Sequence, residues 1–356
     1  MSVLRSRTYI EDLKYAVENT NIFDEFRNQS ILITGATGLI GSGIVDVLLM
    51  ANSIKNLNTR IYIAARNLDK AKKRFENFLD KNAKSFLTFV NYDATQSNMI
   101  DFYVDYIIHA AGNAHPKAFV EYPVDTMIGN INGLNELLTY AKNNKTKNLL
   151  YVSSSEVYGQ KNDLSPWKET EYGYLDILNP RNAYASSKRA AETLCVSYYK
   201  QYAVKTNIVR PGHIYGPTAS PNDSRVGSVF AYSVAMGNDI VLKSDGKQLR
   251  SYCYVLDCVT AILTVLVKGE VACAYNISNC ESIISIEQLA KFYALKGNVN
   301  LIFACPTKLE KDAFNPMSNS SLDSTKIESL GWKGLFDAKM GSAHTITILK
   351  EIQEVL

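Results

Sequence analysis

What this sequence lacks excludes several classes of protein. Its six cysteines include no Cys-x-x-Cys pair and are too sparse for a disulfide framework, so we expect free thiols and no metal site. No apolar run approaches the roughly 18 residues that cross a bilayer, and no signal peptide is recognisable. We therefore expect a cytoplasmic protein with no membrane partner. The net charge of +3 comes from scattered residues rather than a basic block, so we also expect no nucleic-acid partner.

What the sequence does contain is a regular alternation of short apolar runs with segments of helical spacing. Such an alternation indicates βαβ units and a parallel sheet. We therefore predict an α/β fold: a Rossmann-type doubly wound parallel sheet with a smaller C-terminal α/β cap. The apolar runs lie at 31–33 and in RIYIAAR, LTFVNYD, VDYIIHAAG, NLLYVSSSE and KTNIVRPG.

The same rhythm divides the chain into three predicted parts. Residues 1–28 have helical spacing without recognisable chemistry, and we expect an N-terminal helical extension. Residues 29–215 carry the alternating runs and are predicted to form the dinucleotide-binding part. After about residue 215 the pattern breaks into shorter pieces with Gly and Ser between them, so 216–356 are predicted to form mainly the cap, from which the chain can cross back to the sheet.

A glycine-rich turn follows the first apolar run. In TGATGLIG, Gly35, Gly38 and Gly41 stand between a strand and a helix. Glycine is needed where the backbone turns sharply and approaches a pyrophosphate, and the helix N-terminus that follows attracts the phosphates. The turn therefore predicts a dinucleotide site, with the intervening Thr37, Leu39 and Ile40 beside the cofactor.

The choice of dinucleotide depends on the ends of the second and third strands. An acidic residue after the second strand typically holds the ribose of NAD, whereas an arginine accommodates the 2′-phosphate of NADP. This chain has Arg66 there, which favours NADP(H) and leaves NAD(H) as the alternative; Arg66 can equally be a surface arginine. Asp93 ends the third strand, where it is placed to meet the adenine or to form a turn.

Tyr184 and Lys188 stand four residues apart in AYASSKR. On a helix this spacing puts both side chains on one face, where the ammonium favours the tyrosinate. A phenol with a lowered pKa can serve as an acid or base near neutral pH. The alternative is an ordinary stretch of amphipathic helix.

Several motifs in this order resemble the extended short-chain dehydrogenase/reductases, which include nucleotide-sugar epimerases, 4,6-dehydratases, decarboxylases and reductases. The motifs are GATGLIG, HAAG, SSSEVYG, the Tyr184/Lys188 pair, RPGHIYGP, GKQLRSYCYVLD and LGW. The resemblance implies that Tyr184 is the acid/base and that Lys188 bridges the tyrosine and the nicotinamide ribose. It also implies Ser154 as the hydroxyl on the substrate oxygen, and Ala110 and Ala111 beside the cofactor.

Two further features of the resemblance concern the substrate. Glu156 is similar to the second acid/base of dehydratases and decarboxylases. Dehydratases commonly have Asp-Glu where this chain has Ser-Glu, which leaves a decarboxylase-like pattern. The alternative is that Glu156 only forms a hydrogen bond with the following turn. The cap implies a nucleotide-diphosphate sugar, with Arg225 and Arg250 on its phosphates. His213 replaces the usual asparagine beside them.

These features leave three functions open. Arg66 favours an NADP(H)-linked oxidoreductase that reduces a keto group of a nucleotide-activated sugar or sugar-alcohol precursor for surface polysaccharide synthesis. Glu156 favours the alternative, a redox-neutral decarboxylase, 4,6-dehydratase or epimerase that retains NAD(P). The third is a non-enzymatic, cofactor-sensing protein. We also expect a homodimer.

Overall fold

The structure is a computed structural model that describes residues 2–78, 80–96, 100–112, 119, 121–307 and 317–354. Its centre is a seven-stranded sheet in the order β10-β6-β5-β4-β1-β2-β3, and every adjacent pair is parallel. The direction of strand order reverses between β1 and β4, where doubly wound sheets bind ligands. This arrangement confirms the predicted Rossmann-type sheet. The strands are β1 (Ser30–Thr34), β2 (Arg60–Ala65), β3 (Leu87–Asn91), β4 (Tyr106–His109), β5 (Asn148–Val152), β6 (Thr206–Pro211) and β10 (Cys273–Ile277).

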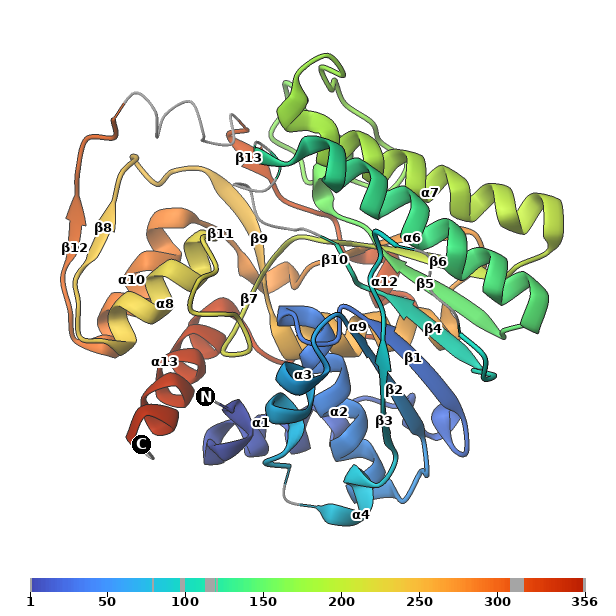
Figure 1. Cartoon of the computed structure of the whole chain (residues 1–356). Coiled ribbons are helices and arrows are strands. Elements are labelled where there is room, and N and C mark those ends of the chain that lie inside the picture. The colour runs from blue at the N-terminus through green and yellow to red at the C-terminus, as the bar shows by residue number, and fades with distance from the viewer. Residues whose placement is uncertain are drawn as a thin grey trace.

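Helices cover both faces of this sheet (Figure 1). Successive side chains of a strand point to opposite faces. Ile31 and Ile33 of β1 accordingly pack with one helical layer, whereas Leu32 packs with the other. The first layer holds α1 (Arg7–Glu18), α2 (Leu39–Lys55), α3 (Leu68–Phe75), α4 (Lys81–Lys84) and α9 (Val255–Lys268), and the second holds α6 (Pro123–Asn144) and α7 (Ala183–Tyr202).

A smaller α/β part lies beside the carboxyl ends of the large sheet (Figure 1). Its four-stranded sheet contains β11-β9-β13 with β7 also paired to β9, and a separate pair joins β12 to β8. Its elements are β7 (His213–Tyr215), α8 (Val226–Ala235), β8 (Ile240–Leu242), β9 (Leu249–Tyr254), β11 (Ile283–Ser285), α10 (Ile286–Gly297), β12 (Leu301–Phe303), β13 (Asn319–Ser320) and α13 (Ala338–Glu354). The short helix α12 (Thr325–Glu328) instead contacts β10 of the large sheet.

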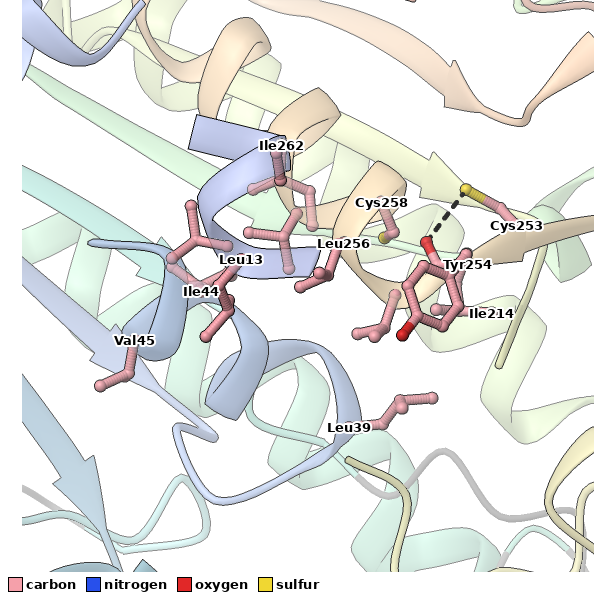
Figure 2. Packing of buried hydrophobic residues seen from close by; sticks show 14 of the residues in the cluster. Leu13, Leu39, Ile44, Val45, Ile214, Cys253, Tyr254, Leu256, Cys258 and Ile262 are labelled. Atoms are coloured by element: carbon pink, nitrogen blue, oxygen red, sulfur yellow. Dashed lines mark hydrogen bonds between the residues drawn. The ribbon is translucent and has the colours of Figure 1, made fainter. Parts of the chain in front are cut away.

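The polypeptide after residue 216 contributes to both parts. After β9 it returns to the large sheet as α9, which packs against α2, and as β10, which pairs with β6. Helix α1 contacts α2, α9 and α13, and Figure 2 shows Leu13, Ile44 and Ile262 from α1, α2 and α9 packed in one core. The boundaries at residues 28 and 215 remain a proposal. None of the helices in the described part of the chain combines the length and apolarity needed to cross a bilayer.

Candidate active site

The glycine turn joins β1 to α2 at the carboxyl edge of the sheet. Gly35 has a φ of +68°, in the left-handed region, and a Cβ atom there would lie 2.6 Å from the Ala110 carbonyl oxygen. A Cβ atom on Gly41 would overlap the Gly35 carbonyl group. Gly38 is the N-cap of α2, so the first N–H groups of this 17-residue helix face the turn. The structure brings together the residues predicted for the pyrophosphate, namely Gly35, Thr37, Gly38, Leu39, Ile40 and Gly41, with Ala110 and Ala111 against them.

Arg66 and Asp93 follow β2 and β3 at the same edge. Arg66 is exposed, and its charge acts on Asp93. Hydrogen bonds from the backbone and hydroxyl of Thr95, with a weaker contribution from Arg66, lower the pKa of Asp93. The two side chains are therefore neighbours where β2 and β3 end, which is the position expected for the adenosine half of a dinucleotide.

Tyr184 and Lys188 lie in the first turns of α7, and both are buried. The Lys188 ammonium donates to the Val152 carbonyl at 2.8 Å and lies 4.5 Å from the centre of the Tyr151 ring and 5.7 Å from that of Tyr184. Burial lowers the pKa of Lys188 to about 7, against the opposing charge of Glu192.

The pKa of Tyr184 differs from the expectation drawn from the sequence. Burial raises it to about 12, while a hydrogen bond with Ser154 and the charge of Arg225 oppose this shift. The expected lowering by Lys188 is absent because desolvation outweighs nearby charges here and the ammonium bonds to a carbonyl group of β5 instead. Phe119 stacks on the Tyr184 ring at 4.1 Å between centroids and keeps it buried.

Ser154 and Glu156 lie beside the Tyr184 hydroxyl, at the end of β5. Ser154 is the N-cap of a short 3₁₀ helix, η3 (Ser155–Tyr158), and its hydroxyl accepts the Glu156 N–H at 3.2 Å. The Glu156 carboxylate forms an ion pair with Arg181 at 3.5 Å, and its charge also acts on Tyr184. Burial raises the pKa of Glu156, and Arg181 opposes that shift. Ser154, Glu156, Tyr184 and Lys188 are thus brought into one cluster.

The three cap residues predicted to bind substrate also lie close together. Arg250 of β9 is buried, and no carboxylate in the described part of the chain pairs with it. Arg225, at the N-cap of α8, forms an ion pair with Asp223. His213 begins β7; burial and the charges of Arg250 and Arg225 lower its pKa to about 3, so its ring is neutral. Because the charge of Arg225 acts on both His213 and Tyr184, this cluster adjoins the one that contains Tyr184.

Three further residues near these clusters are not predicted from the sequence. Phe119 and Arg181 carry no motif of their own, because each meets its partner only in the folded chain. Glu192 follows Lys188 by four residues on α7, a spacing that predicts a same-face neighbour. Its carboxylate accepts a hydrogen bond from Ser153 at 2.6 Å and forms an ion pair with Arg210.

The fold and the site together define a dinucleotide-dependent enzyme of Rossmann type. The chain belongs to the NAD dependent epimerase/dehydratase family, whose sequence profile matches residues 31–278. This match confirms the resemblance to the extended short-chain dehydrogenase/reductases and the prediction of an enzyme.

Three known proteins illustrate the likeness. UDP-glucuronic acid decarboxylase 1 of Xenopus tropicalis is 31% identical over 73% of this chain, and the match spans 59% of the frog protein's length. The dTDP-D-glucose 4,6-dehydratase of Dictyostelium discoideum is 30% identical over 75% of this chain and 62% of its own length. A solved structure of the Streptomyces venezuelae dTDP-glucose 4,6-dehydratase with bound NAD covers 91% of this chain and 98% of that chain, with 22% identity and a TM-score of 0.75. These relatives support the redox-neutral alternative better than the predicted keto reductase.

Proposed function

We propose that this protein is a redox-neutral decarboxylase of a nucleotide-linked uronic acid, with UDP-glucuronic acid as the first substrate to test. The observation that carries the proposal is the position of Glu156, whose N–H bonds to the Ser154 hydroxyl and whose charge acts on Tyr184; this position suits a second acid/base. A simple ketone reduction needs one proton donor, whereas removal of a carboxyl group also needs a proton delivered to carbon. The decarboxylase from Xenopus supports this choice of reaction.

The glycine turn fits a dinucleotide, because Cβ atoms at Gly35 or Gly41 would fill the space that the backbone leaves there. The turn holds the pyrophosphate, Ala110 and Ala111 line the cofactor, and Lys188 meets the nicotinamide ribose. When bound there, NAD(P) would supply reversible hydride transfer to and from the sugar. The preference for NADP(H), which Arg66 predicts, remains part of the proposal within a family that is NAD-dependent.

The catalytic cluster handles the protons. Tyr184 takes the proton of the C4 hydroxyl as that group becomes a ketone and later returns it, while Ser154 orients the oxygen. The charge of Arg225 favours the ionised phenol. A C4 ketone makes the uronic acid a β-keto acid, so the C5–C6 bond breaks, carbon dioxide leaves and the electron pair forms an enolate. Glu156, whose pKa is raised by burial, then delivers a proton to C5.

The cap binds the nucleotide end. The buried Arg250 and the partly buried Arg225 present guanidinium groups suited to bidentate contact with phosphate oxygens. The neutral His213 has a buried Nδ1 without a hydrogen-bond partner among the described residues, and this atom contacts the substrate in the proposed complex.

We further propose a cytoplasmic homodimer that supplies precursors for surface polysaccharide. Exposed apolar side chains on α6 and α7 support self-association, among them Val124, Ile128, Val196 and Tyr199. Light scattering on the purified protein tests the dimer, and a monomer at all concentrations would contradict it.

The reaction is tested by incubating the purified protein separately with UDP-glucuronic acid, dTDP-glucose and UDP-glucose. The masses of the products are then determined by mass spectrometry. A decarboxylase converts UDP-glucuronic acid to a UDP-pentose without added reductant. A product that has lost water, an isomer of unchanged mass, or turnover only with stoichiometric NADPH would each replace this proposal with dehydratase, epimerase or reductase.

A further inference from the structure

Arg181 lies directly in front of the catalytic helix. It belongs to η4 (Pro180–Asn182), a 3₁₀ helix that leads into α7 three residues before Tyr184. The Asn179 side chain accepts the Arg181 N–H at 3.1 Å, and the Asn182 amide donates to the Asp176 carbonyl at 2.9 Å. These bonds fix the backbone of η4, which holds Arg181 close to the start of α7.

The Arg181 guanidinium has fewer hydrogen-bond partners among the described residues than the guanidinium groups of Arg189 and Arg210. One of its terminal nitrogens lies 3.5 Å from the Glu156 carboxylate, and among the described residues it has no other side-chain or carbonyl partner. Arg189, by contrast, donates to three carbonyl groups, and Arg210 is surrounded by Glu192 and other acceptors. A guanidinium has five N–H donors, so most of those on Arg181 remain available. The side chains of Arg181 and Glu156 are 24% and 26% exposed, which leaves both accessible to a ligand.

We propose that Arg181 is the specificity-determining residue that selects a sugar bearing a carboxylate. This inference rests on the proposed function, because it requires the substrate to be a uronic acid. Glu156 already shows that a carboxylate fits against this guanidinium, and the planar fork can hold a second one through its remaining donors. The sugar carboxyl group lies one bond from C5, so binding it at Arg181 places C5 beside Glu156.

Sharing of Arg181 between two carboxylates also suits the chemistry. Arg181 opposes the rise in the pKa of Glu156 that burial causes. A substrate anion on the same guanidinium weakens that opposition and adds a negative charge, and both effects favour protonated Glu156. Protonated Glu156 is the form that can give a proton to C5 after carbon dioxide has left.

The test compares the binding of an acidic and a neutral nucleotide sugar. The cofactor-loaded Tyr184→Phe protein binds either sugar without consuming it, and Arg181→Gln and Arg181→Lys are added to this background. Calorimetry then gives Kd for UDP-glucuronic acid and for UDP-glucose. Arg60→Gln is the matched control, because its loss removes the same charge. Arg60 is exposed and begins β2, at the edge of the sheet opposite to the one that carries the candidate site.

We expect Arg181→Gln to raise the Kd for UDP-glucuronic acid at least about tenfold and to change the Kd for UDP-glucose by less than about twofold. Only the acidic sugar loses a charge-assisted hydrogen bond. Arg181→Lys should recover part of this difference, and Arg60→Gln should show none of it. Equal losses for both sugars, or no loss, would overturn the role of Arg181. If Arg181→Gln fails to fold, a Kd ratio in Arg181→Lys equal to that of the parent would overturn that role instead. Failure of the protein with Tyr184 to release carbon dioxide would refute the proposed reaction, and the ratio of the two Kd values would still report on Arg181.

Discussion

The buried ion pair between Arg210 and Glu192 gives the most quantitative prediction for this fold. It joins β6 to α7 next to the catalytic helix turns, and the two side chains are only 2% and 10% exposed. Arg210 reaches the carboxylate through Nε at 3.0 Å and Nη2 at 2.6 Å, and it also contacts Tyr158 and the Glu169 carbonyl. Burial lowers the pKa of Arg210, but the bonds to Glu192 raise it above its ordinary value.

Replacing Arg210 with Leu leaves Glu192 as a buried carboxylate with Ser153 as its remaining hydrogen-bond donor in the network described here. Loss of one partner from a buried pair costs about 3–5 kcal/mol, and we expect Arg210→Leu near the upper end. Glu192→Met should cost less, because Arg210 keeps Tyr158 and the Glu169 carbonyl as acceptors. Replacing both charges with apolar residues removes the uncompensated charge, so the double variant Glu192→Met/Arg210→Leu should cost less than the sum of the single changes.

The measurement is the free energy of unfolding in urea, followed by circular dichroism, for the single and double variants. Arg7→Leu serves as the control, since its i,i+4 partner Glu11 and Arg7 itself are largely exposed and such pairs contribute about 0–1 kcal/mol. A coupling energy of at least about 2 kcal/mol is expected for the buried pair. Single-variant losses below about 1 kcal/mol, or strict additivity, would refute the reasoning.

Three further predictions concern the catalytic tyrosine, the cofactor and the pH dependence of stability. Tyr184→Phe should lower kcat by about 10²–10⁴-fold while cofactor still binds, because the phenol carries the proton; a loss smaller than about tenfold would remove Tyr184 from the acid/base role. Arg66→Asp should reduce the NADP-over-NAD ratio of kcat/KM by at least about tenfold, and an unchanged ratio would make Arg66 a surface arginine. A hydrogen bond to Asp12 raises the folded pKa of His344, so its stabilisation is complete below the unfolded value of about 6.5 and is lost as pH rises through the folded pKa. Urea midpoints measured across this range should fall with rising pH in the parent and change less in His344→Gln; parallel curves would contradict the assignment.

The large sheet is predicted well from the sequence, because its strands and its glycine turn are specified by short contiguous stretches of residues. Most strands contain a short apolar run, and β1 is buried along all five residues, as expected for a parallel strand covered on both faces. The glycine turn is equally readable, since Gly35 needs a positive φ and Gly41 needs the space of a missing Cβ. The return of the chain through β10 is less visible, because β10 lies after residue 215, where the regular alternation of apolar runs and helical segments breaks down.

The site is only partly predictable for the same reason. The residues of the Tyr184/Lys188 pair stand one helical turn apart, whereas the pair formed by Glu156 and Arg181 spans a loop whose path the sequence pattern does not specify. The spacing predicts a lowered pKa for Tyr184, because it reveals a nearby ammonium but not the desolvation that burial and Phe119 impose. Electrostatics at this site depends on burial, and burial is a property of the whole fold.

Burial also explains why the region around Lys188 is suited to a bound ligand. Nε2 of His109 and the hydroxyl of Tyr151 are buried there without partners among the described residues, and Oδ1 of Asn130 shares this condition. His109 stacks on Tyr151, whose ring faces the Lys188 ammonium, and burial with that charge lowers the pKa of His109 to about 3. Each unsatisfied buried group costs about 1–3 kcal/mol, so an interior selected for stability alone would pair or replace them. A neutral His109 and a Lys188 with a pKa of about 7 keep this region low in fixed charge. These unpartnered polar atoms are therefore hard to explain by stability alone.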